Sequence, residues 1–232
     1  AWYTTVLNNC EQAKKAAPND IADAATLKNA LAVTDILEVY AYYNLVNTYG
    51  NIPYSQAMNS DVPFPKYDDA KTLFLDLLDR LDKAIADLDE NAGSWGSADL
   101  VYGGDPAMWK KFAYSFELKM AMVLADVDAA KAQSVAEAAA PNVFSSNSDN
   151  ALFAFQGSPP NTNPIWVDLV QSGRQDFVAD STIVGAMQSL NDPRIPLYFT
   201  KDKNGGYSGG IAGKGNTYSI FSKPAEAIVA PD

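Results

Sequence analysis

The sequence of 232 residues contains no histidine and only one cysteine, Cys10. The lack of histidine excludes Ser-His-Asp and Cys-His nucleophilic catalysis, and it excludes every metal site that depends on imidazole ligands. A single cysteine can form neither an internal disulfide nor a zinc cluster of cysteines. Composition therefore removes the commonest catalytic and metal-binding arrangements before any motif is considered.

Basic residues and long apolar runs are also scarce. The chain has 17 Lys and Arg residues against 28 Asp and Glu residues, which gives a net charge of −11, and the acidic residues are spread along the sequence. Such a surface repels phosphate backbones, so nucleic acid is not an expected partner. No apolar run approaches the ~20 residues of a membrane-spanning helix. With 47% hydrophobic and 11% aromatic residues, the chain is expected to fold around a core.

Hydrophobic periodicity predicts a series of helices in the first 140 residues. Gly50 is expected to end the longest of them, and Asp105 to cap the one that begins at Pro106. Another carries a stripe of leucines, with Asp68 and Asp69 in its first turn. The expected ranges are 2 to about 16, with an end at Pro18; 25–49; 67–90; a helix from 106; and 127–139. Long antiparallel helices joined by short or medium loops indicate an all-α fold, either a bundle or a helical-repeat array.

The sequence changes in character after Pro141, where loops rich in Gly, Pro and Asn dominate. We expect two short strands, ALFAFQG (151–157) and RIPLYFT (194–200), and a helix, STIVGAMQSL (181–190). This helix is expected to be capped by Asp180 or Ser181. Loop-rich segments on a helical scaffold are where binding sites usually lie.

The stretch EVYAYYNLVNTYGNIPYSQAM (38–58) carries many tyrosines within a helical pattern. At about 100° per residue, Tyr42 and Tyr49 share one face with valines, while Tyr40 and Tyr43 lie on the other. A helix that is apolar on both faces is normally enclosed by neighbouring helices. Tyrosine suits such a position because its ring can be buried while its hydroxyl reaches a partner or water. We therefore interpret these rings as core packing.

Motifs for cofactors, metals and catalysis are incomplete. GGIAGKGNT contains the Gly-Lys pair of a phosphate-binding loop, but Ser208 and Gly215 stand where the motif requires Gly and Ser or Thr. SSNSDN (145–150) lacks the glycine and the distal glutamate of a calcium loop. We expect neither cofactor nor metal. The paired carboxylates of a glycosidase are conceivable, but acids such as Asp76 and Asp79 lie opposite the leucine stripe, so catalysis is not favoured.

Aromatic residues in the predicted loops are better candidates for function. Flat rings stack on the apolar faces of sugars or on extended peptides, and nearby Asn, Gln and Arg side chains can bond to hydroxyl or backbone groups. Loop packing remains the alternative for any one ring. The candidate ligand-binding residues are Tyr54, Phe64, Trp95, Tyr102, Trp166, Arg174 and Tyr207.

Several stretches resemble, in order, landmarks of the SusD/RagB family. The tyrosine helix ends in a Tyr-Gly-x-x-Pro turn, Tyr49 to Pro53, like the family's signature helix. YDDAKTLFLDLLDRLDKAIADL and YGGDPAMWKKFAYSFELKMAMVLAD are similar to its next two helices, and NALFAFQG and SLNDPRIPLYF resemble later landmarks. The Asn-Asp-Pro-Arg segment resembles one subfamily in particular. Together these stretches extend the resemblance over essentially the whole chain.

The resemblance implies an all-α fold of tetratricopeptide-like helix pairs, with a loop-rich ligand side that carries short strands. It implies a single SusD-like domain over residues 1–232, incomplete at both ends because family members are longer. The helical scaffold is expected in 1–140 and the ligand-side segment in 141–232. The turn from Gly50 to Tyr54 is expected to lead into the first ligand-side loop.

The resemblance also implies partners. Family members are lipoproteins on the outer face of the outer membrane that capture oligosaccharides, or in some cases peptides, without catalysis. They cover a TonB-dependent, SusC-like transporter that imports the ligand. The lipid anchor is not expected in this chain, since Cys10 follows Val-Leu-Asn-Asn and not an apolar lipobox. The acidic composition suits neutral glycans or cationic peptides.

A second hypothesis is a helical-repeat scaffold that binds another protein through its concave face, without a small ligand. Both hypotheses predict the same helices. They differ over Trp95, Trp166 and Tyr207: convergence of these rings on one exposed platform favours ligand capture, whereas buried or scattered rings favour the scaffold.

Overall fold

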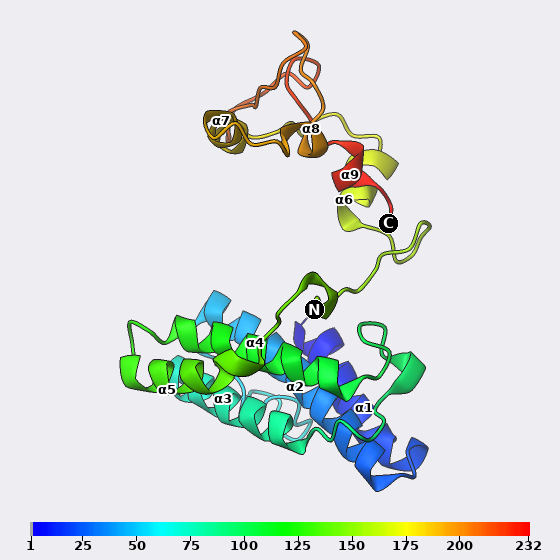
Figure 1. The fold of residues 1–232 in the computed structure, drawn as a ribbon, viewed down its shortest axis with the longest axis vertical. Helices are drawn as coiled ribbons and strands as arrows, with labels where there is room; N and C mark the ends of the chain where they lie inside the picture. The colour runs from blue at the N-terminus through cyan, green and yellow to red at the C-terminus, as the bar shows by residue number, and fades with distance from the viewer. Residues whose placement is uncertain (1) are drawn as a thin grey trace. The chain divides into compact units, whose positions relative to one another are not determined.

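Helix α2 (Ala24–Tyr49) is the longest described helix, and other helices pack along it in the computed structural model, which describes residues 2–232 (Figure 1). Its N-cap is Asp23, whose side chain accepts a hydrogen bond of 2.8 Å from the Thr26 N–H. It ends at Gly50, whose φ of 72° is a conformation that glycine adopts without steric cost. The helix predicted over 25–49 is thus confirmed.

The chain forms two compact units, which divide between Phe153 and Ala154. The helical segments of the first unit are η1 (Trp2–Leu7), α1 (Asn8–Asp20), α2, α3 (Ala70–Asp87), η2 (Gly96–Ala98), α4 (Pro106–Val123), α5 (Ala129–Ala139), η3 (Ala140–Asn142) and η4 (Asn147–Asp149). Strands β1 (Ile52–Pro53) and β2 (Tyr67–Asp68) form a short antiparallel pair after α2. Consecutive helices pack in pairs, α2 on α3 and α4 on α5, and α1 lies along α2 (Figure 1). The predicted all-α class with tetratricopeptide-like helix pairs is confirmed.

The core of the first unit lies between these helices. Leu77 and Leu81 of α3 are fully buried, and burial of such a side chain stabilises the fold by roughly 1.5–3 kcal/mol. On α2, Tyr43 packs its ring at 85° against Phe116 of α4, with centroids 5.1 Å apart. Tyr42 is likewise buried. The interpretation of these two tyrosines as core residues is therefore confirmed.

The core interpretation is wrong for Tyr49, which is 67% exposed, and only partly right for Tyr40, which is 39% exposed and packs one side against Phe116. Tyr49 is the last residue of α2. Tyr42 and Tyr43 are enclosed by neighbouring helices, whereas Tyr49 is not. Apolar residues on both faces of the helix therefore predicted burial along its whole length, and this prediction is wrong at the last turn.

Three predicted helix boundaries in the first unit are wrong. Helix α1 continues through Pro18 to Asp20. A proline in the last turn costs the helix only one backbone hydrogen bond, and Ala17 beside it stays fully buried. Helix α3 begins at Ala70, not at Tyr67, and ends at Asp87, not at Glu90. Asp69 is its N-cap and accepts a 2.9 Å hydrogen bond from the Thr72 N–H, so it is not in the first turn.

The second unit, Ala154–Asp232, has short helices joined by loops. They are α6 (Pro164–Trp166), the π-helix η5 (Val167–Gln171), α7 (Ser181–Ser189), α8 (Ile195–Tyr198) and α9 (Glu226–Val229). The cap predicted for α7 is confirmed, since Asp180 accepts a 2.7 Å hydrogen bond from the Thr182 N–H. Isolated bridges join Asp180 to Gly210 and Phe199 to Pro224. These bonds link loops that are distant in sequence.

Both strands predicted after Pro141 are wrong. Residues 151–156 have no regular structure. Alternating apolar residues form a strand only beside a partner strand, and within residues 2–232 this segment has none. Its one backbone hydrogen bond to a nearby segment of the described chain runs from the Gln156 N–H to the Asn161 carbonyl, at 2.7 Å. The stretch 194–200 contains α8, since Pro196 holds a helical φ in its first turn. Only Phe199 makes a β-bridge.

Glu117 is an acid inside the helical core, 3% exposed on α4. Burial raises the pKa of its carboxyl to about 8, and a hydrogen bond to the Asp82 carboxylate adds to the rise. Because the pKa is raised in the folded state, this group stabilises the fold fully below the pKa of an unfolded glutamate, about 4.3. That contribution is lost as the pH rises through about 8.

We expect Glu117→Gln to flatten the dependence of the unfolding free energy on pH. The wild-type free energy should fall by up to about 1.4 kcal/mol per pH unit between pH 5 and 8, whereas an amide keeps the buried group neutral throughout. Urea unfolding at pH 5, 6.5 and 8 measures this. Glu137→Gln on the exposed side of α5 is the control, and equal slopes in wild type and Glu117→Gln would contradict the prediction.

Asn29 ties the loop after α3 to α2. It is fully buried, and its amide donates 2.8 Å hydrogen bonds to the carbonyls of Asp89 and Gly93. Its oxygen accepts a 2.8 Å hydrogen bond from the Asp89 N–H. One side chain therefore fixes the backbone that leads into Trp95.

We expect Asn29→Ala to lower the unfolding free energy by about 2–4 kcal/mol, because it leaves several buried backbone groups without partners. Asn44→Ala is the matched control, since the Asn44 amide bonds only within α2, to the Tyr40 carbonyl. Its effect should stay below about 0.5 kcal/mol in the same urea titration. A loss of similar size in both variants would show that the Asn29 bonds are replaced by water.

Candidate functional site

An open cleft lined with aromatic rings lies where α2 ends. Its volume is about 480 Å³. It forms where η1, the last turn of α2, β1 and β2 meet. The lining residues are Trp2, Tyr3, Leu45, Tyr49, Asn51, Ile52, Pro53 and Tyr67. None of these side chains is charged at neutral pH, so recognition of a ligand there would depend on contact and hydrogen bonding.

The rings of this cleft are accessible. Tyr49 and Tyr67 are 67% and 71% exposed, and Trp2 is 38% exposed. Leu45 and Ile52 are buried. The cleft thus combines an apolar base with exposed flat rings, whose hydroxyl and indole groups can still bond to a ligand.

Hydrogen bonds fix the backbone around the cleft. The Tyr3 hydroxyl donates to the Pro53 carbonyl over 2.6 Å, and burial raises the pKa of Tyr3 to about 12. Asp68 accepts from the N–H of Ser55 at 2.7 Å, and this bond is the main reason that its pKa falls to about 2. The Asn51 oxygen accepts from the Ala70 N–H at 2.9 Å. Within residues 2–232 the Asn51 NH₂ group has no bond, so it can donate to a ligand.

Two sequence candidates lie on the loop that joins β1 to β2, and they face different surroundings. Phe64 is 91% exposed, close in sequence to Tyr67 of the cleft. Tyr54 instead packs edge to face on Tyr42, with centroids 4.8 Å apart. Of these two, only Phe64 presents a free ring.

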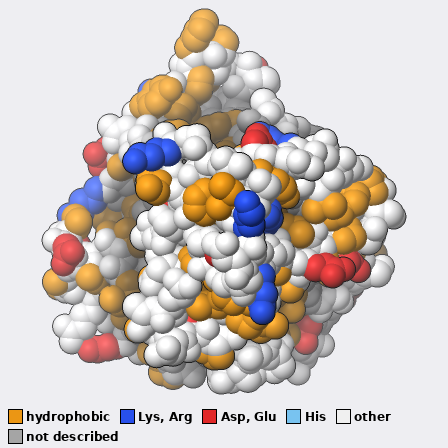
Figure 2. All heavy atoms as spheres, turned by 90° about the horizontal axis from the view of Figure 1, so that it is seen from above, with side chains coloured by type: hydrophobic (Ala, Val, Ile, Leu, Met, Phe, Trp, Pro, Cys, Tyr) orange, Lys and Arg blue, Asp and Glu red, His pale blue; other side chains and the backbone are white. Residues whose placement is uncertain are grey.

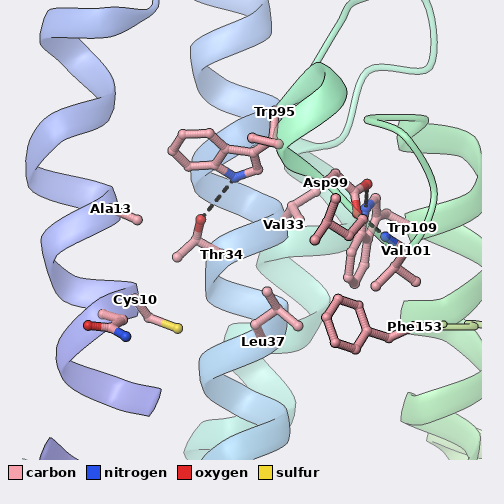
Figure 3. A pocket seen from close by; sticks show the side chains of 13 residues that line it. Cys10, Ala13, Val33, Thr34, Leu37, Trp95, Asp99, Val101, Trp109 and Phe153 are labelled. Atoms are coloured by element: carbon pink, nitrogen blue, oxygen red, sulfur yellow. Dashed lines mark hydrogen bonds between the residues drawn. The ribbon is translucent and has the colours of Figure 1, made fainter. Parts of the chain in front are cut away.

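Trp95 lines a different hollow, a groove of about 470 Å³ between α1, α2 and the segment that follows α3 (Figure 3). Its indole N–H donates to the Ala30 carbonyl at 2.9 Å and to the Thr34 hydroxyl at 3.2 Å. Asp99 accepts from the Trp109 indole at 2.6 Å and from nearby backbone N–H groups. The Trp95 indole and the Asp99 carboxylate are thus used within the fold, and the surface of the groove is almost wholly apolar.

Tyr102 is a packing residue in this structure. Its ring meets Trp109 edge to face, with centroids 5.4 Å apart, and its hydroxyl donates to the Asp149 carbonyl over 2.9 Å. Burial raises its pKa to about 12. Neither its ring face nor its hydroxyl is directed to the aromatic cleft, which it does not line.

The remaining candidates belong to the second unit and do not line one hollow. Arg174 is exposed, bonds to Asp176 through Nε at 2.8 Å, and lines a small hollow of about 110 Å³. Trp166 and Tyr207 are half-buried and are not among the lining residues. Trp166 ends α6 and so is not in a loop, because Asn163 caps a helical turn there. Convergence of Trp95, Trp166 and Tyr207 on one platform stays a prediction.

Trp2, Tyr49, Asn51 and Tyr67 line the cleft but are not among the candidates drawn from the sequence. Tyr49 and Tyr67 fell inside predicted helices, where a ring is interpreted as core. The available signal was position: Tyr49 directly precedes the Gly50 turn, and a ring at the end of a helix has fewer neighbours.

Figure 2 shows one face of the molecule, on which charged side chains are scattered and neither sign forms a continuous area. Within residues 2–232, no group of His, Cys, Asp and Glu side chains is placed to hold a metal ion. Over the same residues, no helix has the length and apolar character needed to cross a bilayer.

The fold is similar to solved SusD homologs. One from Bacteroides uniformis is 26% identical with a TM-score of 0.84, and the match covers 99% of this chain and 48% of that one. A chitin-binding SusD homolog from Flavobacterium johnsoniae is 27% identical with a TM-score of 0.79, over 99% and 48% of the two chains. One from Bacteroides thetaiotaomicron is 30% identical with a TM-score of 0.75, over 100% and 48%.

The chain therefore spans about half the length of these solved relatives. No protein of curated function matches it significantly. The SusD-like family described as "Starch-binding associating with outer membrane" matches residues 1–231. On this match over nearly every residue, together with the shared fold, the chain belongs to the SusD-like family.

Proposed function

We propose that the aromatic cleft at the end of α2 binds a neutral oligosaccharide. The observation that carries this proposal is the set of accessible, uncharged rings around Tyr49 and Tyr67, beside the unbonded NH₂ group of Asn51. Sugar rings present apolar C–H faces that stack on aromatic rings, and hydroxyl groups that need donors and acceptors. The cleft offers both, whereas the surface of the groove at Trp95 is almost wholly apolar.

The charge of the protein supports a neutral ligand. The chain carries a net charge of −11, which disfavours sulfated or phosphorylated glycans, and no lining residue of the cleft is a cation that could offset it. A solved relative described as a chitin-binding SusD homolog, 27% identical, adds support for a glycan. Chitin oligomers are uncharged and are therefore a suitable first ligand.

In our proposal the protein binds the oligosaccharide and does not catalyse a reaction. The lining of the cleft includes no carboxylate, lysine or cysteine, so it has no pair of groups for general acid and base catalysis. The family description, which includes association with the outer membrane, supports a role at that membrane. In our proposal the protein is lipid-anchored at the cell surface and delivers oligosaccharide to a TonB-dependent, SusC-like transporter.

We expect Tyr67→Ala and Tyr49→Ala each to weaken oligosaccharide binding by about three- to tenfold, since one stacked ring contributes about 0.5–1.5 kcal/mol. Calorimetric titration with chitin oligomers and neutral glucans measures this. Phe155→Ala, which removes an exposed ring of the second unit, should leave the affinity unchanged.

Other outcomes would redirect the proposal. Binding of oligopeptides but of no sugar would favour a peptide-capturing member of the family. Loss of sugar binding in Trp95→Ala, with Tyr67→Ala unaffected, would move the site to the groove in Figure 3. If no sugar and no peptide binds in the titration, the helical-repeat scaffold that binds another protein would be favoured.

A further inference from the structure

Tyr54, which follows the lining residue Pro53 in the sequence, is hydrogen-bonded to helix α3. Pro53 lines the cleft, and Tyr54 packs its ring edge to face on Tyr42 at 90°. The Tyr54 hydroxyl donates to Asp76 and accepts a 3.1 Å hydrogen bond from Nη1 of Arg80, and both partners lie on α3. Burial raises the pKa of Tyr54 to about 12, so the hydroxyl keeps its proton and makes both bonds.

Arg80 is itself held by two acids on α2. Its guanidinium bonds to Asp35, through Nε at 3.3 Å and through Nη2, and Nη2 also donates to Glu38 over 2.8 Å. Lys14 of α1 bonds to the same two acids, at 2.8 and 2.6 Å. Glu38 is 3% exposed, and charge-assisted bonds away from water are strong. A rotation of Arg80 away from this group would leave two acids with one cation.

The same backbone segment is held from the other side by Tyr3. Its hydroxyl bonds to the Pro53 carbonyl at 2.6 Å, and its ring meets Tyr42 edge to face with centroids 6.3 Å apart. Tyr3 and Tyr54 thus both pack on the ring of Tyr42. One wall of the cleft is clamped between these two tyrosines, and only one of them, Tyr3, lines the cleft.

We propose that Arg80 and Tyr54 are positioning residues for the cleft: without touching the ligand, they hold Pro53 and the loop that carries Phe64 and Tyr67 in the binding geometry. This inference rests on the proposed function of the cleft. It assigns the ion pairs of α1, α2 and α3 a role in ligand affinity in addition to stability. It also gives Tyr54 a role other than stacking on the ligand.

Tyr54→Phe tests the proposal, because it keeps the ring on Tyr42 and removes only the hydroxyl. We expect faster amide hydrogen exchange over residues 52–68 and an oligosaccharide affinity lower by about three- to tenfold, which corresponds to about one hydrogen bond. Tyr102→Phe is the matched control, since it removes a hydroxyl that bonds to the Asp149 carbonyl. It should change neither measurement.

Arg80→Lys is a second variant, which keeps the charge but loses the planar fork that spans Tyr54 and the two acids. The same rise in exchange over residues 52–68 is expected. Unchanged exchange in both variants overturns the proposal, and so does faster exchange with unchanged affinity. If the variants exchange faster but the wild-type protein binds no oligosaccharide, the clamp is supported and the proposed function is refuted.

Discussion

A helix that is apolar on opposite faces must be covered on both, and this constraint on α2 organises the first unit. Helix α1 packs along α2, α3 along another side, and α4 contributes Phe116 to the tyrosines. The cover stops short of the last turn, where Tyr49 stays exposed. The cleft exists because the packing of α2 ends before the helix does.

Acids near this helix core are accommodated in two different ways. Glu38 pairs with cations from α1 and α3, while the raised pKa of Glu117 keeps it mostly protonated against Asp82 at neutral pH. The first arrangement links three helices and reaches the cleft through Tyr54. The second joins only α4 to α3. A buried acid can therefore connect distant elements when cations from several helices share it, and contributes mainly to packing when it is neutral.

The helices could be predicted because their signals are local. Gly50 ends α2 and Asp105 with Pro106 begins α4, as capping chemistry requires, and the family resemblance drawn from these landmarks is confirmed. The conformation after Pro141 could not be predicted in this way, since alternating apolar residues form a strand only beside a partner strand, and residues 151–156 have none in the part of the chain that the structure describes. The site was anticipated only as aromatic rings in loops. Its lining comes from residues 2–3, 45–53 and 67, which only the tertiary fold brings together.

The uncharged lining of the cleft has a consequence for where such a protein can work. Attraction between charges is screened over about 8 Å at an ionic strength of 0.15 M, and over shorter distances in stronger salt. Stacking and neutral hydrogen bonds escape most of this screening. In the proposed function, an oligosaccharide held by Trp2, Tyr49, Asn51 and Tyr67 would therefore stay bound in fresh and in saline surroundings alike.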